Sequence, residues 1–322
     1  MKSYERFRLH VQVDEEGEGR ATIAIAFVAN VLVAAAKTVA AMITGSSSLR
    51  TEAVHSWVDV GNEGFVVAAA RTARRGADER HPMGYGRASY VWSLFASLGM
   101  LLAGAVVGVW QGIRQLGEPD VASDYLIGYV VIGVSFLLEG YSFIQTLRQV
   151  RKDADELGRD VFEQAFRTSN SPIRAVFTED FTALIALVIA ALGMLFHQLT
   201  GVATYDAIGS ILIGLVMAMA ALMLISRNGR YLAGQTIAAD QRGRVLAALR
   251  ANAEINRITF VYAEFIGPER LLLLAGVGIA GDHTQAELAT ILRDLERRVM
   301  QHKYVGLAIL TLATPEDADL VD

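Results

Sequence analysis

A histidine and an aspartate, His55 and Asp59, stand one helical turn apart in a segment that otherwise has the composition of a membrane span. The i, i+4 spacing puts both side chains on one face of a helix. Ionisable groups are costly in hydrocarbon, so a chain that keeps them there commonly uses them on an ion or proton pathway. An imidazole nitrogen and a carboxylate oxygen form half of a coordination shell for a divalent transition metal.

Three more polar side chains share this face of the second span. With about 100° per residue, Glu52, Asn62 and Glu63 fall in the same wedge of about 100° as His55 and Asp59. This clustering favours a shared purpose, namely a cation site. The alternative is a buried hydrogen-bond network that holds helices together, with Glu52 and Glu63 simply near the two membrane interfaces.

A second acidic pair, Glu179 and Asp180, lies in the fifth span. Adjacent residues point about 100° apart, so both cannot face one site equally. Asp180 shares its side of the helix with small residues that permit close helix approach, so we predict Asp180 as the ligand and Glu179 as an assisting or proton-carrying carboxylate. The alternative is an interfacial carboxylate pair. Lys37 and Glu139 are further polar residues of the first and fourth spans, and we do not predict either as a ligand.

Composition and length favour a polytopic membrane protein. The chain has 322 residues, of which 53% are hydrophobic and 20% charged, and its net charge of −5 gives no sign of nucleic-acid binding. It contains no cysteine, so thiolate metal sites and disulfides are excluded. Six apolar stretches are long enough to cross a bilayer, which takes roughly 20 residues. They are Ala21–Ile43, Thr51–Ala70, Ala88–Ile113, Tyr125–Leu147, Ala175–Leu199 and Tyr205–Ile225.

Lys and Arg residues predict the orientation of these spans. They are frequent after the second and fourth spans and nearly absent after the third and fifth. Because basic loops remain on the cytoplasmic side, both termini are predicted to be cytoplasmic. We expect a cytoplasmic segment over residues 1–20, a transport domain over 21–226 and a soluble domain over 227–322. The expected location is a bacterial inner membrane.

The residues after the last span predict a small α+β domain in the order α-β-β-α-β. A capping box at Thr284 and Glu287 opens the second helix of this domain. The other predicted elements are a helix over Ala239–Ala253 and strands over Ile258–Phe265, Arg270–Ile279 and Val305–Leu312.

The sequence resembles the cation diffusion facilitator family of metal transporters. The resemblance rests on the segments 45–62, 78–87 and 205–214 and on the order of six spans followed by the small domain. It implies a homodimer that exports divalent cations in exchange for protons, and a ferredoxin-like C-terminal domain that serves dimerisation. It also implies a transport site with two ligands from the second span and two from the fifth.

Within this resemblance, His55 and Asp59 match the first pair of ligands and Asp180 matches one member of the second pair. Val176 stands where many members have His or Asp, so the fourth ligand is Glu179, Asn62, water or absent. Asp78 and His81 match positions that bind an accessory metal in some members. Because Tyr85 replaces a histidine there, we expect a weak accessory site at most.

The expected function is zinc efflux driven by protons, with Zn²⁺ as substrate and no resident cofactor. An export of Mn²⁺ or Fe²⁺ is the alternative within the family, because imidazole and carboxylate donors suit these ions and disfavour Cu⁺. A membrane metal sensor or scaffold that does not transport, and a passive cation channel, are the rivals from other classes. No enzyme is expected, because the chain has no His-Glu-x-x-His motif and no nucleophile constellation.

Overall fold

The computed structural model describes residues 18–73, 75–117 and 125–320, with side chains from residue 27 onward except at 240. The predicted N-terminal segment 1–20 therefore lies almost entirely outside the described residues. The chain divides into two compact units. A helical unit contains the described residues up to Ala70 and Tyr90–Gly229, and a second unit contains Arg71–Ser89 and the residues from Arg230 onward.

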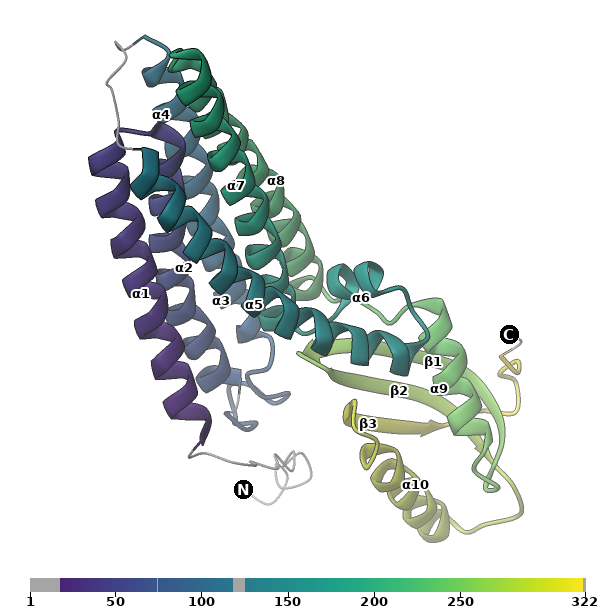
Figure 1. Cartoon of the computed structure of the whole chain (residues 1–322). Helices are drawn as coiled ribbons and strands as arrows, with labels where there is room; N and C mark the ends of the chain where they lie inside the picture. Colours follow the sequence, from purple (N-terminus) through teal and green to yellow (C-terminus); the bar gives the residue numbers. More distant parts are fainter. Residues whose placement is uncertain (1–17, 74, 118–124, 321–322) are drawn as a thin grey trace. The chain divides into compact units, whose positions relative to one another are not determined.

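The helical unit is a bundle of long helices (Figure 1). Its long elements are α1 (Glu18–Thr44), α2 (Ser47–Ala73), α5 (Tyr125–Leu157), α7 (Ser171–Thr200), α8 (Thr204–Leu232) and the continuous run Ala88–Gln115. That run comprises α3 (Ala88–Gly99), a π-helical segment η2 (Met100–Val106) and α4 (Val107–Gln115). By length and composition, five of these helices can cross a membrane. The remaining one is α2, a helix of 27 residues that carries the polar cluster.

Two features of the bundle differ from the sequence-based expectation. Helix α5 runs ten residues beyond the predicted end at Leu147, because Val150 and Ala154 continue a buried stripe past the apolar span. This stripe packs near Ala165 of a short helix, α6 (Val161–Arg167), which the sequence did not predict. Asn170 then caps α7 by accepting a hydrogen bond from the backbone N–H of Ile173.

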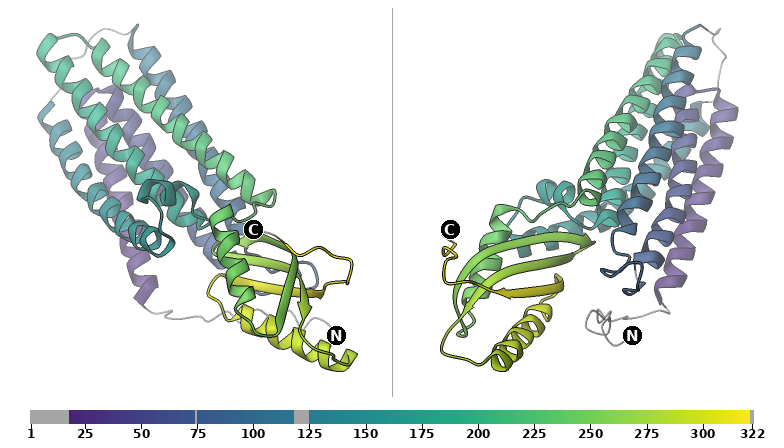
Figure 2. Two further views of the ribbon diagram at one scale, coloured as in Figure 1. Left: turned by 90° about the vertical axis from the view of Figure 1, so that its right-hand side faces the viewer. Right: turned by 180° about the vertical axis from the view of Figure 1, so that it is seen from behind.

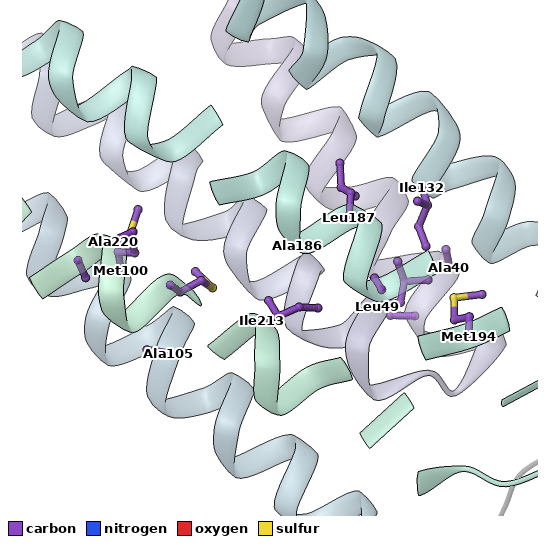
Figure 3. Close-up of a cluster of buried hydrophobic side chains, with 14 residues drawn as sticks. Ala40, Leu49, Met100, Ala105, Ile132, Ala186, Leu187, Met194, Ile213 and Ala220 are labelled. Atoms are coloured by element: carbon purple, nitrogen blue, oxygen red, sulfur yellow. The ribbon is translucent and has the colours of Figure 1, made fainter. Parts of the chain in front are cut away.

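An apolar core joins all of the long helices (Figure 3). It contains Leu49 of α2, Met100 of η2, Ile132 of α5, Leu187 of α7 and Ile213 of α8, all buried. Alanines fill the spaces between them, which lets the helices approach closely. Along α2 and α7, this core lies between the polar cluster and the ends of the helices at Ser47 and Thr200.

A buried carboxylate fixes the start of α2. Asp206, near the start of α8, accepts hydrogen bonds from the backbone N–H of Ser47 at 2.5 Å and from the hydroxyls of Ser46 (2.8 Å) and Ser48. Its side chain has no exposed area. A carboxylate at a helix N-terminus satisfies free N–H groups and complements the helix dipole. The contact therefore fixes the position of α2 along the bundle axis relative to α8. It thereby also fixes the position of His55.

The second unit contains a three-stranded sheet with two helices (Figure 2, green to yellow). Its elements are α9 (Ala239–Arg250), β1 (Ile255–Gly267), β2 (Arg270–Ile279), α10 (Gln285–Met300) and β3 (Val305–Leu312). The central strand β2 pairs antiparallel with β1 and parallel with β3. This is the predicted α-β-β-α-β order, and the predicted capping box opens α10. Leucines of both helices join one face of the sheet in a single core.

Candidate metal transport site

The predicted ligands His55 and Asp59 lie next to each other on α2. The His55 side chain is 1% exposed, and its Nε2 atom lies 3.5 Å from Oδ1 of Asp59. On the other side of the ring, Nδ1 lies 3.7 Å from Oε1 of Glu52. Neither nitrogen of His55 makes a hydrogen bond, and the facing oxygens of Asp59 and Glu52 are buried without a hydrogen-bond partner as well.

These unsatisfied atoms fit a site for a cation. Buried polar groups in native proteins are almost always hydrogen-bonded, so four adjacent unsatisfied donors or acceptors require an explanation. A divalent cation binds to the lone pairs of imidazole nitrogens and carboxylate oxygens, so a bound cation would give these atoms a partner. A network that only holds helices together, the alternative, would satisfy its own members, whereas these four atoms have no hydrogen-bond partner.

Helix α7 brings the second pair of predicted residues to the same region. The side-chain N–H of Asn62 donates to Oε1 of Glu179 at 2.8 Å, which joins α2 to α7 one turn beyond Asp59. Asp180 accepts a hydrogen bond of 2.8 Å from the hydroxyl of Ser142 on α5.

The arrangement is an open cluster rather than a closed cage. Among the described residues, no three His, Asp or Glu side chains lie close enough together to hold a metal ion as they stand. The structure brings His55 to Asp59 and Asn62 to Glu179, whereas Asp180 is engaged by Ser142. Binding of an ion by the predicted set therefore requires these side chains to converge.

Lys37 forms an ion-pair triad with Glu52 and Glu139. Its Nζ atom lies 3.0 Å from Oε2 of Glu52 and 2.7 Å from Oε1 of Glu139, and its side chain is 1% exposed. Lys37 thus pairs with Glu52, a carboxylate of the predicted cluster. Through Glu52 the triad contacts the ring of His55. A buried lysine between two carboxylates offsets charge that would otherwise be costly in the bundle.

The predicted accessory ligands belong to the loop of the second unit. Asp78 and His81 are both 48% exposed, and Nδ1 of His81 lies 3.5 Å from Oδ1 of Asp78. The carboxylate of Asp78 already accepts hydrogen bonds from the hydroxyl of Tyr85 and from the backbone N–H groups of Arg80 and His81. These bonds, chiefly the one from Tyr85, lower the pKa of Asp78. The loop thus satisfies Asp78 internally.

Sequence reasoning did not assign Ser142 to the site. The only signal available for it was its position one turn after Glu139 on the fourth span. The contact of Asp206 with the start of α2 was equally hidden, because it joins residues 158 to 160 positions apart.

Comparison with known proteins extends the argument beyond geometry. The family model described as the cation efflux transmembrane domain matches residues 23–233. Metal tolerance protein C4 of Arabidopsis thaliana is 30% identical over 271 residues, which are 84% of this chain and 59% of that protein.

Animal relatives are similar over a comparable region. The mitochondrial proton-coupled zinc antiporter SLC30A9 of Xenopus laevis is 28% identical over 245 residues, which are 76% of this chain and 44% of the relative. The human protein of the same name is 26% identical over 245 residues and is covered to 43%. This chain spans about half the length of the curated relatives it matches. Because the family match covers most of the chain and includes both α2 and α7, the protein belongs to the cation diffusion facilitator family, a family of cation-efflux transporters and not of enzymes.

Proposed function

We propose that the protein exports a divalent cation, Zn²⁺ in the first place, from the cytoplasm in exchange for protons. The observation that carries this proposal is the buried imidazole of His55, which has two unsatisfied nitrogens and lies between two carboxylates. The names of the relatives, a metal tolerance protein and a proton-coupled zinc antiporter, support the substrate and the coupling.

The donor set suits the proposed exchange. Neutral His55 with ionised Asp59 and Asp180 would place about −2 charges around the ion, which offsets its charge in a low-dielectric bundle. Protons compete for the same lone pairs, so protonation of these groups lowers metal affinity. Rocking of the helices about the site would then expose it alternately to the two sides of the membrane.

The proposal also includes the topology. We infer that α2 is a sixth span, because its buried polar residues Glu52, His55 and Asn62 lie within the bundle and its Trp57 is exposed. The basic loops support a cytoplasmic location of both termini. We propose a homodimer in a bacterial inner membrane, although the names of the animal relatives place those proteins in mitochondria.

Transport by purified protein in liposomes tests the site. With a pH-sensitive dye inside the vesicles, addition of Zn²⁺ to the wild-type protein should produce proton movement that depends on the metal. His55→Ala and Asp180→Asn should each abolish this signal, because each removes a proposed ligand. The matched control is His302→Ala, which removes an exposed histidine of the second unit and should transport like the wild type.

Wild-type-like proton movement in both ligand variants would refute the site. Metal flux without proton movement would indicate a channel instead, and an inactive wild-type protein that still binds Zn²⁺ would favour the sensor or scaffold. A competition assay with Mn²⁺, Fe²⁺ and Co²⁺ against Zn²⁺ would identify the preferred substrate.

A further inference from the structure

Glu139 of α5 has one carboxylate oxygen in use and one free. Its Oε1 atom accepts a hydrogen bond of 2.7 Å from Nζ of Lys37. Its Oε2 atom is buried and makes no hydrogen bond. The Glu139 side chain as a whole is 18% exposed. A buried oxygen without a hydrogen-bond partner is costly, and such a group is commonly retained when it binds something else.

The position of α5 brings this carboxylate to the proposed cation site. Helix α5 packs against both α1 and α7. One turn beyond Glu139, Ser142 donates to the carboxylate of Asp180. Lys37 pairs with both Glu139 and Glu52. The free oxygen of Glu52 lies 3.7 Å from Nδ1 of His55. These contacts connect Glu139 to proposed ligands on both α2 and α7.

The predicted ligand set lacks a fourth protein ligand. Val176, one turn before Asp180 on α7, has no donor atom, and Asn62 and Glu179 are engaged with each other. We propose that Glu139 is a further ligand of the transported cation and supplies an oxygen from α5 that compensates for the apolar Val176. This inference rests on the proposed function and revises the expectation from the sequence, in which Glu139 was not a ligand.

Lys37 is then a positioning residue. Its ammonium group holds Oε1 of Glu139 and Oε2 of Glu52, and this leaves Oε2 of Glu139 and Oε1 of Glu52 free. Of these two free oxygens, the one on Glu52 lies beside the ring of His55. An additional carboxylate oxygen makes the donor set harder, which favours Zn²⁺ and Mn²⁺ over Cu⁺.

Glu139 also neutralises the charge of Lys37. The experiment must separate this charge-balancing role from the proposed role as a ligand. A variant that leaves Lys37 with fewer partners can lose metal affinity merely by distorting the bundle. We therefore compare Glu139→Gln with the double variant Lys37→Gln/Glu139→Gln, which keeps the net charge of the wild type. Glu156→Gln is the matched control, because it makes the same substitution at an exposed position of the same helix.

The experiment is a titration of the purified, detergent-solubilised proteins with Zn²⁺ and with Co²⁺, whose visible absorption reports the ligand set. We expect Glu139→Gln and the double variant each to weaken Zn²⁺ binding about tenfold or more and to share an altered Co²⁺ spectrum, while Glu156→Gln matches the wild type. If Glu139→Gln does not fold, the double variant carries the test alone.

A double variant with wild-type affinity and spectrum would overturn the inference, because charge balance would then explain Glu139 fully. A single variant that matches the wild type would overturn it too. If the wild-type protein itself binds neither metal, the proposed function fails together with this inference. If the wild type binds and the Glu139 variants are unaffected, only the inference fails.

Discussion

At the scale of single residues, the spacing of polar side chains in the sequence predicted neighbours on one helix but not partners on different helices. The i, i+4 pair His55 and Asp59 could be read directly, because helix geometry alone places the two side chains together. The triad of Lys37, Glu52 and Glu139 could not, because it joins residues up to 102 positions apart. Such contacts depend on how the helices are rotated and packed.

The loop residue Asp78 gives a prediction for pH. Replacing Tyr85 by Phe removes the hydroxyl that donates to Asp78, so the pKa of Asp78 should rise toward its ordinary value. The lowered pKa in the folded protein means that this network stabilises the loop fully above the unfolded pKa of about 3.9. That stabilisation is lost as the pH falls through the lower pKa of folded Asp78.

The measurement is a pH titration of the ¹³C-labelled carboxyl carbon of Asp78 by NMR in wild type and Tyr85→Phe. Glu287, whose pKa is lowered by its capping hydrogen bonds with Thr284, is an internal control that Tyr85→Phe should leave unchanged. An unchanged titration of Asp78 in the variant would show that the Tyr85 hydroxyl is not the main cause.

At the scale of elements, hydropathy and capping patterns predicted most helices and strands. Strands β2 and β3 have the predicted bounds, and the capping box opens α10 as expected. The extension of α5 and the short helix α6 were missed, because Val150, Ala165 and Phe177 form a small local core that does not appear as a hydrophobic span in the sequence. Tertiary packing, rather than composition, determines these residues' structure.

Close contact of α8 with the end of η2 and the start of α4 gives a prediction about helix packing. A Cβ atom at Gly214 would lie 2.8 Å from the backbone nitrogen of Val109 and 2.9 Å from the backbone oxygen of Ala105, so Gly214→Ala must push the helices apart. We expect a loss of about 1–3 kcal/mol in the free energy of unfolding in detergent. Gly229, on the same helix, has no atom within 4 Å of an added Cβ.

Gly229→Ala is therefore the matched control and should leave stability unchanged or raise it by up to about 1 kcal/mol. Thermal or denaturant unfolding followed by circular dichroism measures both variants. Equal effects of the two substitutions would mean that α4 and α8 do not pack this closely.

At the scale of the whole molecule, the order of apolar and basic segments predicted the topology, and the absence of cysteine makes that topology easy to test. Single cysteines can be placed at Val202, in the exposed link between α7 and α8, and at Asp282, exposed between β2 and α10. In intact cells, a membrane-impermeant maleimide should label Val202→Cys only. Asp282→Cys should react once the membrane is opened, and labelling of Asp282→Cys in intact cells would contradict the proposed orientation.

The π-helical segment Met100–Val106 has a consequence for how this chain tolerates changes in length. A π-turn accommodates one residue more than α-helical winding does, while the flanking helices keep their facing. Deletion of one residue from the π-helical segment would convert it to regular α-helix. Tyr90, before the segment, and Gly112, after it, would keep their present neighbours. The same loss in α7 between Asn170 and Asp180 would rotate the acidic pair by roughly 100°. The third span, which supplies none of the proposed ligands, can therefore lose one residue without turning its two ends. A deletion in α7 before the acidic pair would move proposed ligands away from the cation.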